Sequence, residues 1–373
     1  MIKPGLRIGL IGTGFMGRTH VLGYTSAPRL FELDFDLELH TVADITESSA
    51  SEAASRYGFS HSTEVWQNIT SHPDIDVVSI TTPNSLHKDI ALDAIANGKH
   101  VYCEKPLATT LADGYEMTEA AEAKGLKTQV GFNYLCNPIL QLAHEMIAAG
   151  ELGEIRSYRG IHAEDYMASE DAPYSFRYES QGGGALADLG SHALATAEFL
   201  CGPVECLMGD CVTAIKTRVD ASGETHAVEV DDTGRAFVRF ANGATGSIEG
   251  NWIATGRKMQ HDFEIYGSKG ALRFTQERFS ELHFYSMTDN NARHGFRRIE
   301  AAPCHPPYDR FCVAPGHQLG FNDLKAIEVA GFCDAIANKS EEPFNFRAGL
   351  RIQHLVNAVQ QSSREKQWIT IAV

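Results

Sequence analysis

The sequence predicts an α/β protein in two parts: a doubly wound parallel sheet at the N-terminus and a following domain with an open, mainly antiparallel sheet. The chain has 373 residues, which is enough for two domains. Short β-rich runs alternate with helical stretches from residue 7 to about residue 128, and hairpin signals with a period of two follow. We therefore expect domains at 1–128 and 129–373, and the C-terminal helix can pack back on the first of them.

The first region alternates between strands and helices. RIGLIG, LELHTVAD, DVVSITTP, HVYCEKP and KTQVGFNY are β-rich, and helical stretches separate them. Alternation of this kind is typical of a parallel sheet with crossover helices. Residues 27–36, APRLFELDFD, read as a loop inserted before the second strand. Asn84 or Ser85 can cap the helix that follows TTP.

The second region begins with a helix at 137–150 and a strand at 154–165. RAFVRF and TGSIEGNW alternate around Asn242-Gly243, and DFEIY and ALRF alternate around a glycine-flanked turn, as in β-hairpins. The segment 290–318 is rich in Pro, His, Arg and Asn, and we expect a long loop there. The remaining predicted elements are helices at 322–338 and 347–364 and a last strand, WITIAV.

Composition excludes several classes of partner. The net charge of −16 opposes binding to nucleic acid and to anionic membranes. No apolar run reaches the roughly 18 residues that a membrane span needs, and the N-terminus lacks the apolar core of a signal peptide. We expect a cytoplasmic protein whose eight scattered cysteines, Cys103 included, stay reduced and without a catalytic role. At most His162 and Glu164 offer paired metal ligands, so we expect no metal.

A glycine motif opens the chain and predicts a dinucleotide cofactor. G-x-G-x-x-G lies between a strand and a helix, where its glycines permit a tight turn, approach of a pyrophosphate and close helix–strand packing. Asp44, at the end of the second strand, can accept hydrogen bonds from both hydroxyls of an adenine ribose. No Arg or Lys follows directly to hold a 2′-phosphate, which favours NAD over NADP. The motif consists of Gly12, Thr13, Gly14, Phe15, Met16 and Gly17.

Two further segments carry candidate catalytic groups. Lys105 follows a strand at the carboxyl edge of the parallel sheet, and we expect a cis bond before Pro106 that fixes the turn. In GGGALADLGSHALATAEFL (182–200), Asp188 and His192 are four residues apart and share one helix face. Taken alone, this pair is better interpreted as a satisfied buried Asp–His pair. The glycine motif and the lysine favour an acid/base role instead.

Together these motifs resemble the Gfo/Idh/MocA family (glucose–fructose oxidoreductase, inositol dehydrogenase and rhizopine catabolism). The matching stretches are IGTGFMG, TTPNSLH, AIANGKHVYCEKPLA, QVGFNY, GSKGALRF and GGGALADLGSHAL. The resemblance implies a Rossmann domain, a C-terminal α/β domain whose open sheet mediates dimers or tetramers, and NAD(P)-linked oxidation of a secondary alcohol on a sugar, inositol or related polyol. Residues 162–179 look most like the branch of levoglucosan and scyllo-inositol/L-glucose dehydrogenases.

The resemblance also implies a site. The family's catalytic group maps to Lys105, Asp188 and His192, whereas its aspartate three residues after the histidine is Ala195 here, which puts a finer assignment in doubt. Beyond the glycine motif and Asp44, the implied cofactor contacts are Thr81, Thr82, Pro83, Asn84, His87, Glu104, Lys105 and Asn133. The implied substrate contacts are Lys105, Tyr134, Glu164, Arg177, Asp188, His192 and His317, and Phe132 and Asn137 are further pocket candidates.

Oxidation of an alcohol needs a base for the hydroxyl proton, and we assign this role to His192. Lys105 would stabilise the developing alkoxide, and Asp188 would orient the substrate or one of the other two groups. Three alternatives stay open. They are a glycosidase-type enzyme with retained NAD and a keto intermediate, a non-enzymatic NAD-binding regulator, and a 2-hydroxy acid or amino acid dehydrogenase with Arg177 as its carboxylate clamp.

Overall fold

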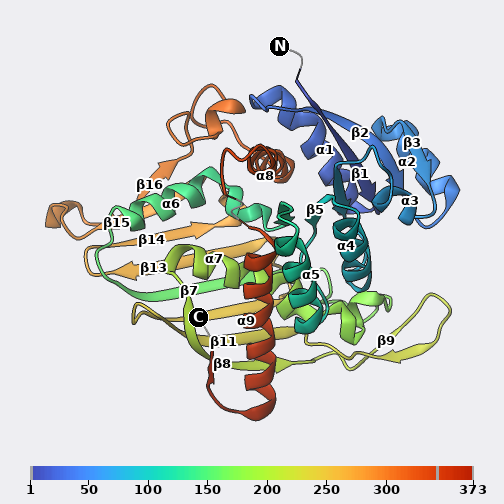
Figure 1. The fold of residues 1–373 in the computed structure, drawn as a ribbon. Helices are drawn as coiled ribbons and strands as arrows, with labels where there is room; N and C mark the ends of the chain where they lie inside the picture. The colour runs from blue at the N-terminus through green and yellow to red at the C-terminus, as the bar shows by residue number, and fades with distance from the viewer. Residues whose placement is uncertain (1–2, 342–343, 372–373) are drawn as a thin grey trace. The chain divides into compact units, whose positions relative to one another are not determined.

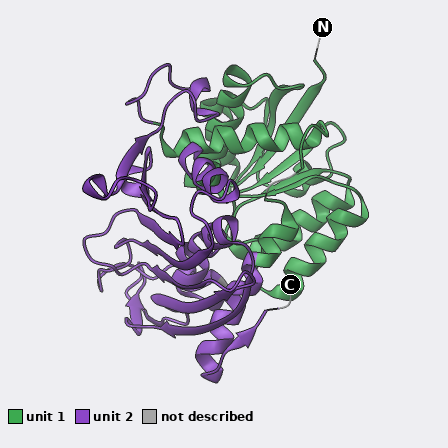
Figure 2. Ribbon diagram, turned by 90° about the vertical axis from the view of Figure 1, so that its left-hand side faces the viewer, with its two compact units in different colours: residues 1–136, 319–351 green, residues 137–318, 352–373 purple. Residues whose placement is uncertain are grey.

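The computed structural model describes residues 3–341 and 344–371, which form two compact units (Figures 1 and 2). Unit 1 consists of Met1–Cys136 and Leu319–Arg351, and unit 2 consists of Asn137–Gln318 and Ile352–Val373. Each unit therefore contains two stretches of chain. The domain boundary expected after residue 128 stays a prediction, because compact units and domains need not coincide.

Unit 1 is built on six parallel strands in the order β3-β2-β1-β4-β5-β6. The order reverses beside β1, and ligands of doubly wound sheets bind at the carboxyl ends of the strands next to such a reversal. β4 is buried along its whole length, as expected for a strand covered on both faces. The strands are β1 Gly5–Ile11, β2 Asp36–Ala43, β3 His61–Thr63, β4 Val77–Ile80, β5 His100–Cys103 and β6 Thr128–Val130.

Two local predictions for unit 1 were wrong. α1 continues to Leu30 and includes Pro28. The first residues of the loop expected at 27–36 are therefore helical, and only its later residues lie outside the helix. Neither Asn84 nor Ser85 caps α4, because both lie in the turn η1 and the N-cap is Leu86. The helices and turns are α1 Phe15–Leu30, α2 Glu47–Tyr57, α3 Gln67–Thr70, η1 Asn84–Leu86, α4 His87–Ala96, α5 Leu111–Ala123 and η2 Asn133–Cys136.

A C-terminal helix completes unit 1. α8, Phe321–Ile336, packs against α1, and its Val329 fills a core with Tyr24 and the apolar side chains of β1. A Cβ atom at Gly23 would lie 3.0 Å from the Val329 side chain, so the absence of a side chain allows the close approach of the two helices. The next helix is α9, Phe346–Glu365.

Unit 2 is built on nine strands in the order β16-β15-β14-β13-β7-β12-β11-β8-β17, and only the β7–β12 pair is parallel. The predicted open, mainly antiparallel sheet is therefore confirmed. The strands are β7 Ile155–Ala163, β8 Val204–Val212, β11 Thr233–Phe240, β12 Thr245–Asn251, β13 Gln260–Gly267, β14 Gly270–Thr275, β15 Glu281–Ser286, β16 Arg297–Glu300 and β17 Ile369–Thr370.

Both predicted hairpins are present, and Gly243 supplies the left-handed turn between β11 and β12 at φ +87°. The loop expected at 290–318 was wrong in part, because β16 pairs with β15 there. The other elements are α6 Pro138–Ala148, α7 Ser191–Cys201, the small hairpin β9 Thr217–Val219 and β10 Thr225–Ala227, and the turns η3 Phe176–Tyr178, η4 Ser180–Gly182, η5 Leu186–Gly190, η6 Gln276–Arg278, η7 Asn291–Arg293 and η8 Tyr308–Arg310.

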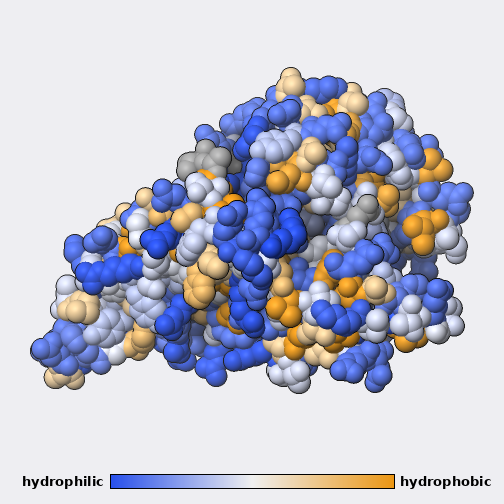
Figure 3. Space-filling model, turned by 90° about the horizontal axis from the view of Figure 1, so that it is seen from below, coloured by the Kyte–Doolittle hydropathy of each residue, from blue (hydrophilic) through white to orange (hydrophobic). Residues whose placement is uncertain are grey.

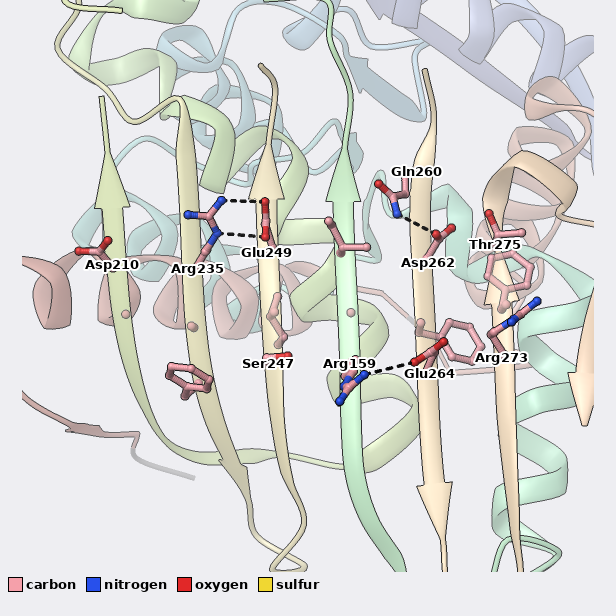
Figure 4. Close-up of a pocket in the computed structure, with 18 of the residues that line it drawn as sticks. Arg159, Asp210, Arg235, Ser247, Glu249, Gln260, Asp262, Glu264, Arg273 and Thr275 are labelled. Carbon is pink, nitrogen blue, oxygen red and sulfur yellow. Dashed lines mark hydrogen bonds and ion pairs between the residues drawn. The ribbon is translucent and has the colours of Figure 1, made fainter. Parts of the chain in front are cut away.

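The helices of unit 2 cover one face of its sheet. α6, α7 and the later part of α9 lie against that face in Figure 1, and Ser362 of α9 accepts a hydrogen bond from Gly209 of β8. Along β11 the burial alternates, with Val238 buried toward the helices and Phe237 exposed on the opposite face. Figure 4 looks onto that opposite face, where Phe237 is 66% exposed, and we call it the uncovered face.

No helix among the described residues is both long and apolar enough to pass through a bilayer. Hydrophilic side chains dominate the face in Figure 3, and hydrophobic ones are scattered among them.

Candidate active site

The glycine turn of unit 1 has three glycines with three different surroundings. Gly12 has φ +95°, and its N–H donates to the Ala43 carbonyl at 2.9 Å. A Cβ at Gly17 would lie 2.2 Å from the Gly12 carbonyl oxygen, so only glycine allows the helix to start this close to the strand. No atom lies within 4 Å of a Cβ built at Gly14, the N-cap of α1. The open N–H groups at the start of α1 suit a phosphate.

Asp44 lies beside this turn. Its Oδ2 accepts from the Thr13 N–H at 3.2 Å and from the Thr13 hydroxyl, and its Oδ1 accepts from the Ile45 N–H at 2.7 Å. The carboxylate is thus fixed between the end of β2 and the glycine turn, and Ile45 next to it is 89% exposed. Phe15 and Met16 follow at the start of α1, where the exposed Phe15 ring stacks on Phe321 at 5.6 Å.

The loop after β4 is tied to the glycine turn and to the lysine segment. The Thr81 hydroxyl donates to the Gly12 carbonyl at 2.7 Å. His87 is fully buried, with Nδ1 2.9 Å from the Pro106 carbonyl and Nε2 3.1 Å from the Thr82 carbonyl. Both ring nitrogens thus face backbone, and His87 joins the two loops. Pro83 and Asn84 lie between them, at the start of η1.

The residues present fit a dinucleotide. Thr82 Oγ1 and Asn133 Nδ2 are buried and have no hydrogen-bond partner among the described residues. Buried polar atoms of this kind are rare in folded proteins, and a bound ligand can satisfy them. Together with the open space at Gly14 and the position of Asp44, they support a nucleotide site at the carboxyl ends of β1, β2, β4 and β6.

Lys105 is the second residue after β5, and the bond to Pro106 is cis, as predicted. Its backbone N–H donates to Glu104 Oε2 at 3.3 Å. A Cβ at Gly131 would lie only 2.5–2.6 Å from the atoms of the Glu104 carboxyl group, so the carboxylate packs directly on the backbone of the neighbouring strand end. Glu104 is only 5% exposed, so its carboxylate contacts the interior of unit 1 and hardly any solvent.

Behind Lys105 lies a buried charged network that sequence reasoning missed. Lys325 Nζ is 2.9 Å from Glu104 Oε1 and 2.7 Å from Glu328 Oε2, and Lys325 has no exposed surface. His20 Nε2 is 2.8 Å from the same Glu104 oxygen. Burial raises the pKa of Glu104, but Lys325 and His20 more than offset this and lower it below its ordinary value. The available signal was a Lys and a Glu three residues apart among the apolar residues in the middle of the helix, LKAIEVA.

In unit 2, Asp188 and His192 do not share one continuous α-helix, and that prediction was wrong. Asp188 lies in the π-helical turn η5, and His192 lies in the first turn of α7. The Leu186 N–H at the start of η5 donates to Asp231 Oδ2 at 2.8 Å, and Gly190 and Gly250 let η5 approach the sheet. Single π-turns of this kind are frequent at functional sites.

Polar and aromatic side chains surround these two residues. The Tyr166 hydroxyl donates to Asp188 Oδ2 at 2.6 Å, and burial together with this carboxylate raises the pKa of Tyr166. The buried His192 ring lies 5.5 Å from His162, whose Nε2 is 3.1 Å from Glu164 Oε1. Tyr166 was missed from sequence, although it lies in the segment HAEDYM that was singled out.

His261 of β13 extends this group. Its ring stacks on His162 at 4.8 Å and 4°, and its Nε2 lies 3.1 Å from the Thr196 hydroxyl. Burial lowers the pKa of His261 well below its ordinary value, so it stays neutral. Ala195 is buried in α7 next to Thr196. Unit 2 thus places two carboxylates, a tyrosine and three imidazoles near one another.

The other predicted residues differ in how close they lie to these groups. Arg177 is exposed and rests on the Phe176 ring at 5.0 Å, and it also interacts electrostatically with Tyr166. His317 is exposed in the loop before α8. In unit 1, Tyr134 is buried, and its ring packs on Phe321 at 5.9 Å. Phe132, slightly earlier in the chain, is also buried. Asn137 caps α6 and donates to the Phe279 carbonyl at 2.9 Å, which accounts for both ends of its side chain.

Two groups of side chains elsewhere have the residue types of a metal site, namely His40, His72 and Asp74, and Asp220, Glu224 and His226. In the first group, Asp74 pairs with Arg7 at 3.0 Å, and its N–H donates to His72 Nδ1. In the second, Asp220 accepts from His226 at 2.8 Å and from two backbone N–H groups of its own turn. These bonds already engage Asp74 and His72 in the first group and Asp220 and His226 in the second, and we assign no metal to either group.

A shallow cavity of about 730 Å³ lies on the uncovered face of the sheet of unit 2 (Figure 4). Arg235 makes a two-armed ion pair with Glu249 at 3.0 and 3.2 Å, and Arg159 lies 3.9 Å from Glu264. Between these charges the face carries apolar side chains, among them Phe237, which is 66% exposed. An apolar strip between paired charges on a flat sheet suits contact with another protein surface.

Family models match both parts of the chain. Residues 6–132 match the model described as an oxidoreductase family with an NAD-binding Rossmann fold. Residues 140–273 match the model of the GFO/IDH/MocA C-terminal domain.

Individual proteins are similar over the whole length. Levoglucosan dehydrogenase of Pseudarthrobacter phenanthrenivorans is 36% identical, and the alignment covers 98% of each chain. A solved structure of levoglucosan dehydrogenase in complex with NADH and levoglucosan superposes with a TM-score of 0.96, at 36% identity and 99% of each chain. An oxidoreductase domain protein from Kribbella flavida gives a TM-score of 0.95, at 36% identity and full coverage of both chains.

Proposed function

Because the chain belongs to the Gfo/Idh/MocA family of NAD-binding oxidoreductases, we propose that it oxidises a secondary hydroxyl of a sugar, inositol or anhydrosugar to a ketone. The similarity to levoglucosan dehydrogenase over nearly the whole of both chains carries this proposal. It favours an anhydrosugar among these substrates. Ala195, at the position of the family aspartate, leaves room for a different ring or a different carbon.

The chain offers a complete set of residues for NAD. The glycine turn and the N-terminus of α1 would hold the pyrophosphate, and Asp44 would accept from the ribose hydroxyls. Thr82 Oγ1 and Asn133 Nδ2 would gain hydrogen bonds from the bound cofactor. When bound, NAD accepts the hydride from the substrate carbon.

The proposed chemistry divides three tasks among Lys105, Asp188 and His192. His192 takes the proton of the hydroxyl, while the hydrogen on the same carbon leaves as hydride. The Lys105 ammonium donates a hydrogen bond to the oxygen as negative charge develops on it. Asp188, held by Tyr166 at 2.6 Å, accepts from a substrate hydroxyl and orients the ring. Glu164, next to His162, supplies a further acceptor for a polyol.

A direct test is NADH formation by the purified protein with a panel of inositols, aldoses and anhydrosugars. We expect activity with at least one of them, and we expect Lys105→Ala and His192→Ala each to lower kcat by about 10²-fold or more. Full activity of both variants would contradict the mechanism. Cleavage of a glycoside without net NADH formation would favour the glycosidase-type alternative, and NAD binding without any turnover would favour a regulator.

The proposal extends to assembly and location. The uncovered sheet face carries Arg159, Arg235 and Arg273 interspersed with acidic side chains, so two copies related by a two-fold axis can place opposite charges against each other. A homodimer formed through this face, or a homotetramer built from it, is the expected state. Phe237→Glu should shift the mass measured by light scattering to that of a smaller species. A cytoplasmic location fits the eight free cysteines.

A further inference from the structure

Lys325 is an unusual residue for the interior of unit 1. It has no exposed surface, yet its Nζ contacts the carboxylates of Glu104 and Glu328 at 2.9 and 2.7 Å and donates to the Tyr102 hydroxyl at 2.9 Å. Desolvation of such an ion costs several kcal/mol, and replacement of a buried ion pair by apolar residues is often neutral or stabilising. Stability alone is therefore a poor explanation for Lys325.

The contacts of Glu104 show what Lys325 holds in place. One carboxylate oxygen, Oε1, faces Lys325 and His20 Nε2, and the other, Oε2, accepts the backbone N–H of Lys105. The carboxylate therefore lies between Lys325 on one side and the backbone of Lys105 on the other. Gly131 leaves it just enough room, because a Cβ there would overlap all three carboxyl atoms.

The protons of this network can be assigned. Burial and the Lys325 charge lower the pKa of His20 to about 4, so His20 is neutral at neutral pH. Its Nε2 faces a carboxylate and must carry the hydrogen, and its Nδ1 then accepts from the Ser79 hydroxyl at 2.7 Å. Tyr24 donates to Ser79 in turn at 3.3 Å. His20 thus contributes a hydrogen bond without a charge, and Lys325 contributes the positive charge that Glu104 needs.

We infer that Lys325 is a positioning residue for the proposed oxidation: it keeps Glu104 ionised and oriented, and Glu104 fixes the backbone from which the Lys105 side chain extends. This inference rests on the proposed function, since the role of Lys105 belongs to it. Lys325 acts through Glu104 and does not itself touch the substrate. Loss of its charge should misplace the Lys105 amine, and a misplacement of about 1 Å can cost about 10²-fold in rate.

An amide cannot replace the Glu104 carboxylate. The Lys325 ammonium, the His20 Nε2–H and the Lys105 N–H are all donors, so the NH₂ end of a glutamine must face a donor in either orientation. Glu104→Gln therefore breaks the same link as Lys325→Met, at the other end. If Lys325 acts through Glu104, the two substitutions together should cost little more than Glu104→Gln alone.

The experiment measures kcat and KM for the best polyol, and Kd for NAD, in Lys325→Met, Glu104→Gln, the double variant and a control. Lys339→Met is the control, since it removes a lysine from an exposed pair with Asp34 in the same unit. We expect Lys325→Met to lower kcat about tenfold or more with Kd for NAD changed by less than about threefold. We expect the double variant to match Glu104→Gln within about threefold. Unchanged kcat in Lys325→Met, or costs that multiply in the double variant, would overturn the inference.

Two further measurements cover other outcomes. If Lys325→Met does not fold, Gly131→Ala tests the same link with every charge retained, because it displaces the Glu104 carboxylate; full kcat in a folded Gly131→Ala would overturn the inference. The acetylation rate of Lys105, read by mass spectrometry, needs no turnover. A changed rate in Lys325→Met but not in Lys339→Met supports the inference even if no polyol is oxidised. If the protein oxidises a polyol but Lys325→Met changes neither the acetylation rate of Lys105 nor kcat, the inference is contradicted. The proposed function is not contradicted by that result.

Discussion

The two buried polar clusters, one around Lys325 in unit 1 and one around His192 in unit 2, differ in the charge that their side chains carry. Lys325 and Glu104 form a charged pair at 2.9 Å, because Lys325 and His20 lower the pKa of Glu104, whereas burial raises the pKa of Glu328. Beside His192, burial lowers the pKa of the His261 imidazole well below its ordinary value, and the neighbouring turn η5 is held by Asp231, whose pKa burial raises to about 6. A charged pair fixes a geometry, whereas a group of imidazoles and a tyrosine supplies hydrogen-bond donors and acceptors between which a proton can move. The first cluster is suited to positioning, and the second to proton transfer.

The largest effect that sharpens this comparison is expected at Asp188. Asp188→Asn removes the charge that accepts from Tyr166 and orients the substrate, and we expect kcat/KM to fall about 10²–10³-fold. Tyr166→Phe should cost about tenfold, because the carboxylate remains and loses one hydrogen bond. Steady-state kinetics with the best polyol measures both. A Tyr166→Phe variant as slow as Asp188→Asn would mean that the tyrosine itself takes part in the proton transfer.

The next effect concerns stability in unit 1. Lys325→Met leaves Glu104 and Glu328 buried without their cation, and we expect a loss of about 3–5 kcal/mol in the free energy of unfolding. Lys339→Met breaks an exposed pair and should cost at most about 1 kcal/mol. Urea unfolding of the two variants at neutral pH makes the comparison. Equal losses would show that the buried network does not differ energetically from a surface pair.

The smallest effect is a pH dependence at Asp231. Its pKa of about 6 lies above the ordinary 3.8 because of burial, so this group contributes stability that is complete below about pH 3.8 and lost as pH rises through about 6. Asp231→Asn keeps an acceptor for the Leu186 N–H and removes this titration. We expect the variant to gain about 2–3 kcal/mol relative to the native chain between pH about 4 and about 7. Thermal unfolding of the variant and the native chain across this pH range measures the gain. A stability difference between the two that does not change with pH would contradict the assignment of this titration to Asp231.

His20 in unit 1 should respond in the opposite direction. Its pKa of about 4 lies below the ordinary 6.5, so its contribution is complete above about pH 6.5 and lost as pH falls toward about 4. Acidification thus weakens the charged cluster of unit 1 while it relieves Asp231 in unit 2. The dependence of stability on pH, measured with variants at His20 and at Asp231, distinguishes the two clusters and does not require a measurement of activity.

Short-range patterns were sufficient to predict much of the fold. The glycine turn, the cis bond before Pro106 and the hairpin at Asn242-Gly243 each depend on a few adjacent residues with unusual backbone preferences. The period-two alternation after residue 233 fixed which side chains of β11 face the helices. Predictions failed where the pattern was ambiguous, as at β16, whose residues pair with β15 although their composition is that of a loop.

The site was harder to predict because its contacts are distant in sequence. Lys325 and Glu104 are 221 residues apart, and no local pattern marks either as the partner of the other. Asp188 and His192 were predicted as site residues, but the π-turn that contains Asp188 depends on Asp231 and Gly250, which belong to other strands and loops. Tyr166 was overlooked because a tyrosine in a polar segment carries no periodic signal. Long-range pairing of polar groups is the information that a single sequence does not display.

The return of α8 to unit 1 has a consequence for how the protein is made. Residues 1–136 contain all six strands of the parallel sheet and the glycine turn, but the cation for Glu104 is on α8. A nascent chain on the ribosome therefore carries a nucleotide-binding half whose interior holds an uncompensated carboxylate until residue 325 has emerged. Final consolidation of this earlier-synthesised part must wait until residue 325 has emerged, which ties the maturation of the lysine segment to synthesis of a much later part of the chain.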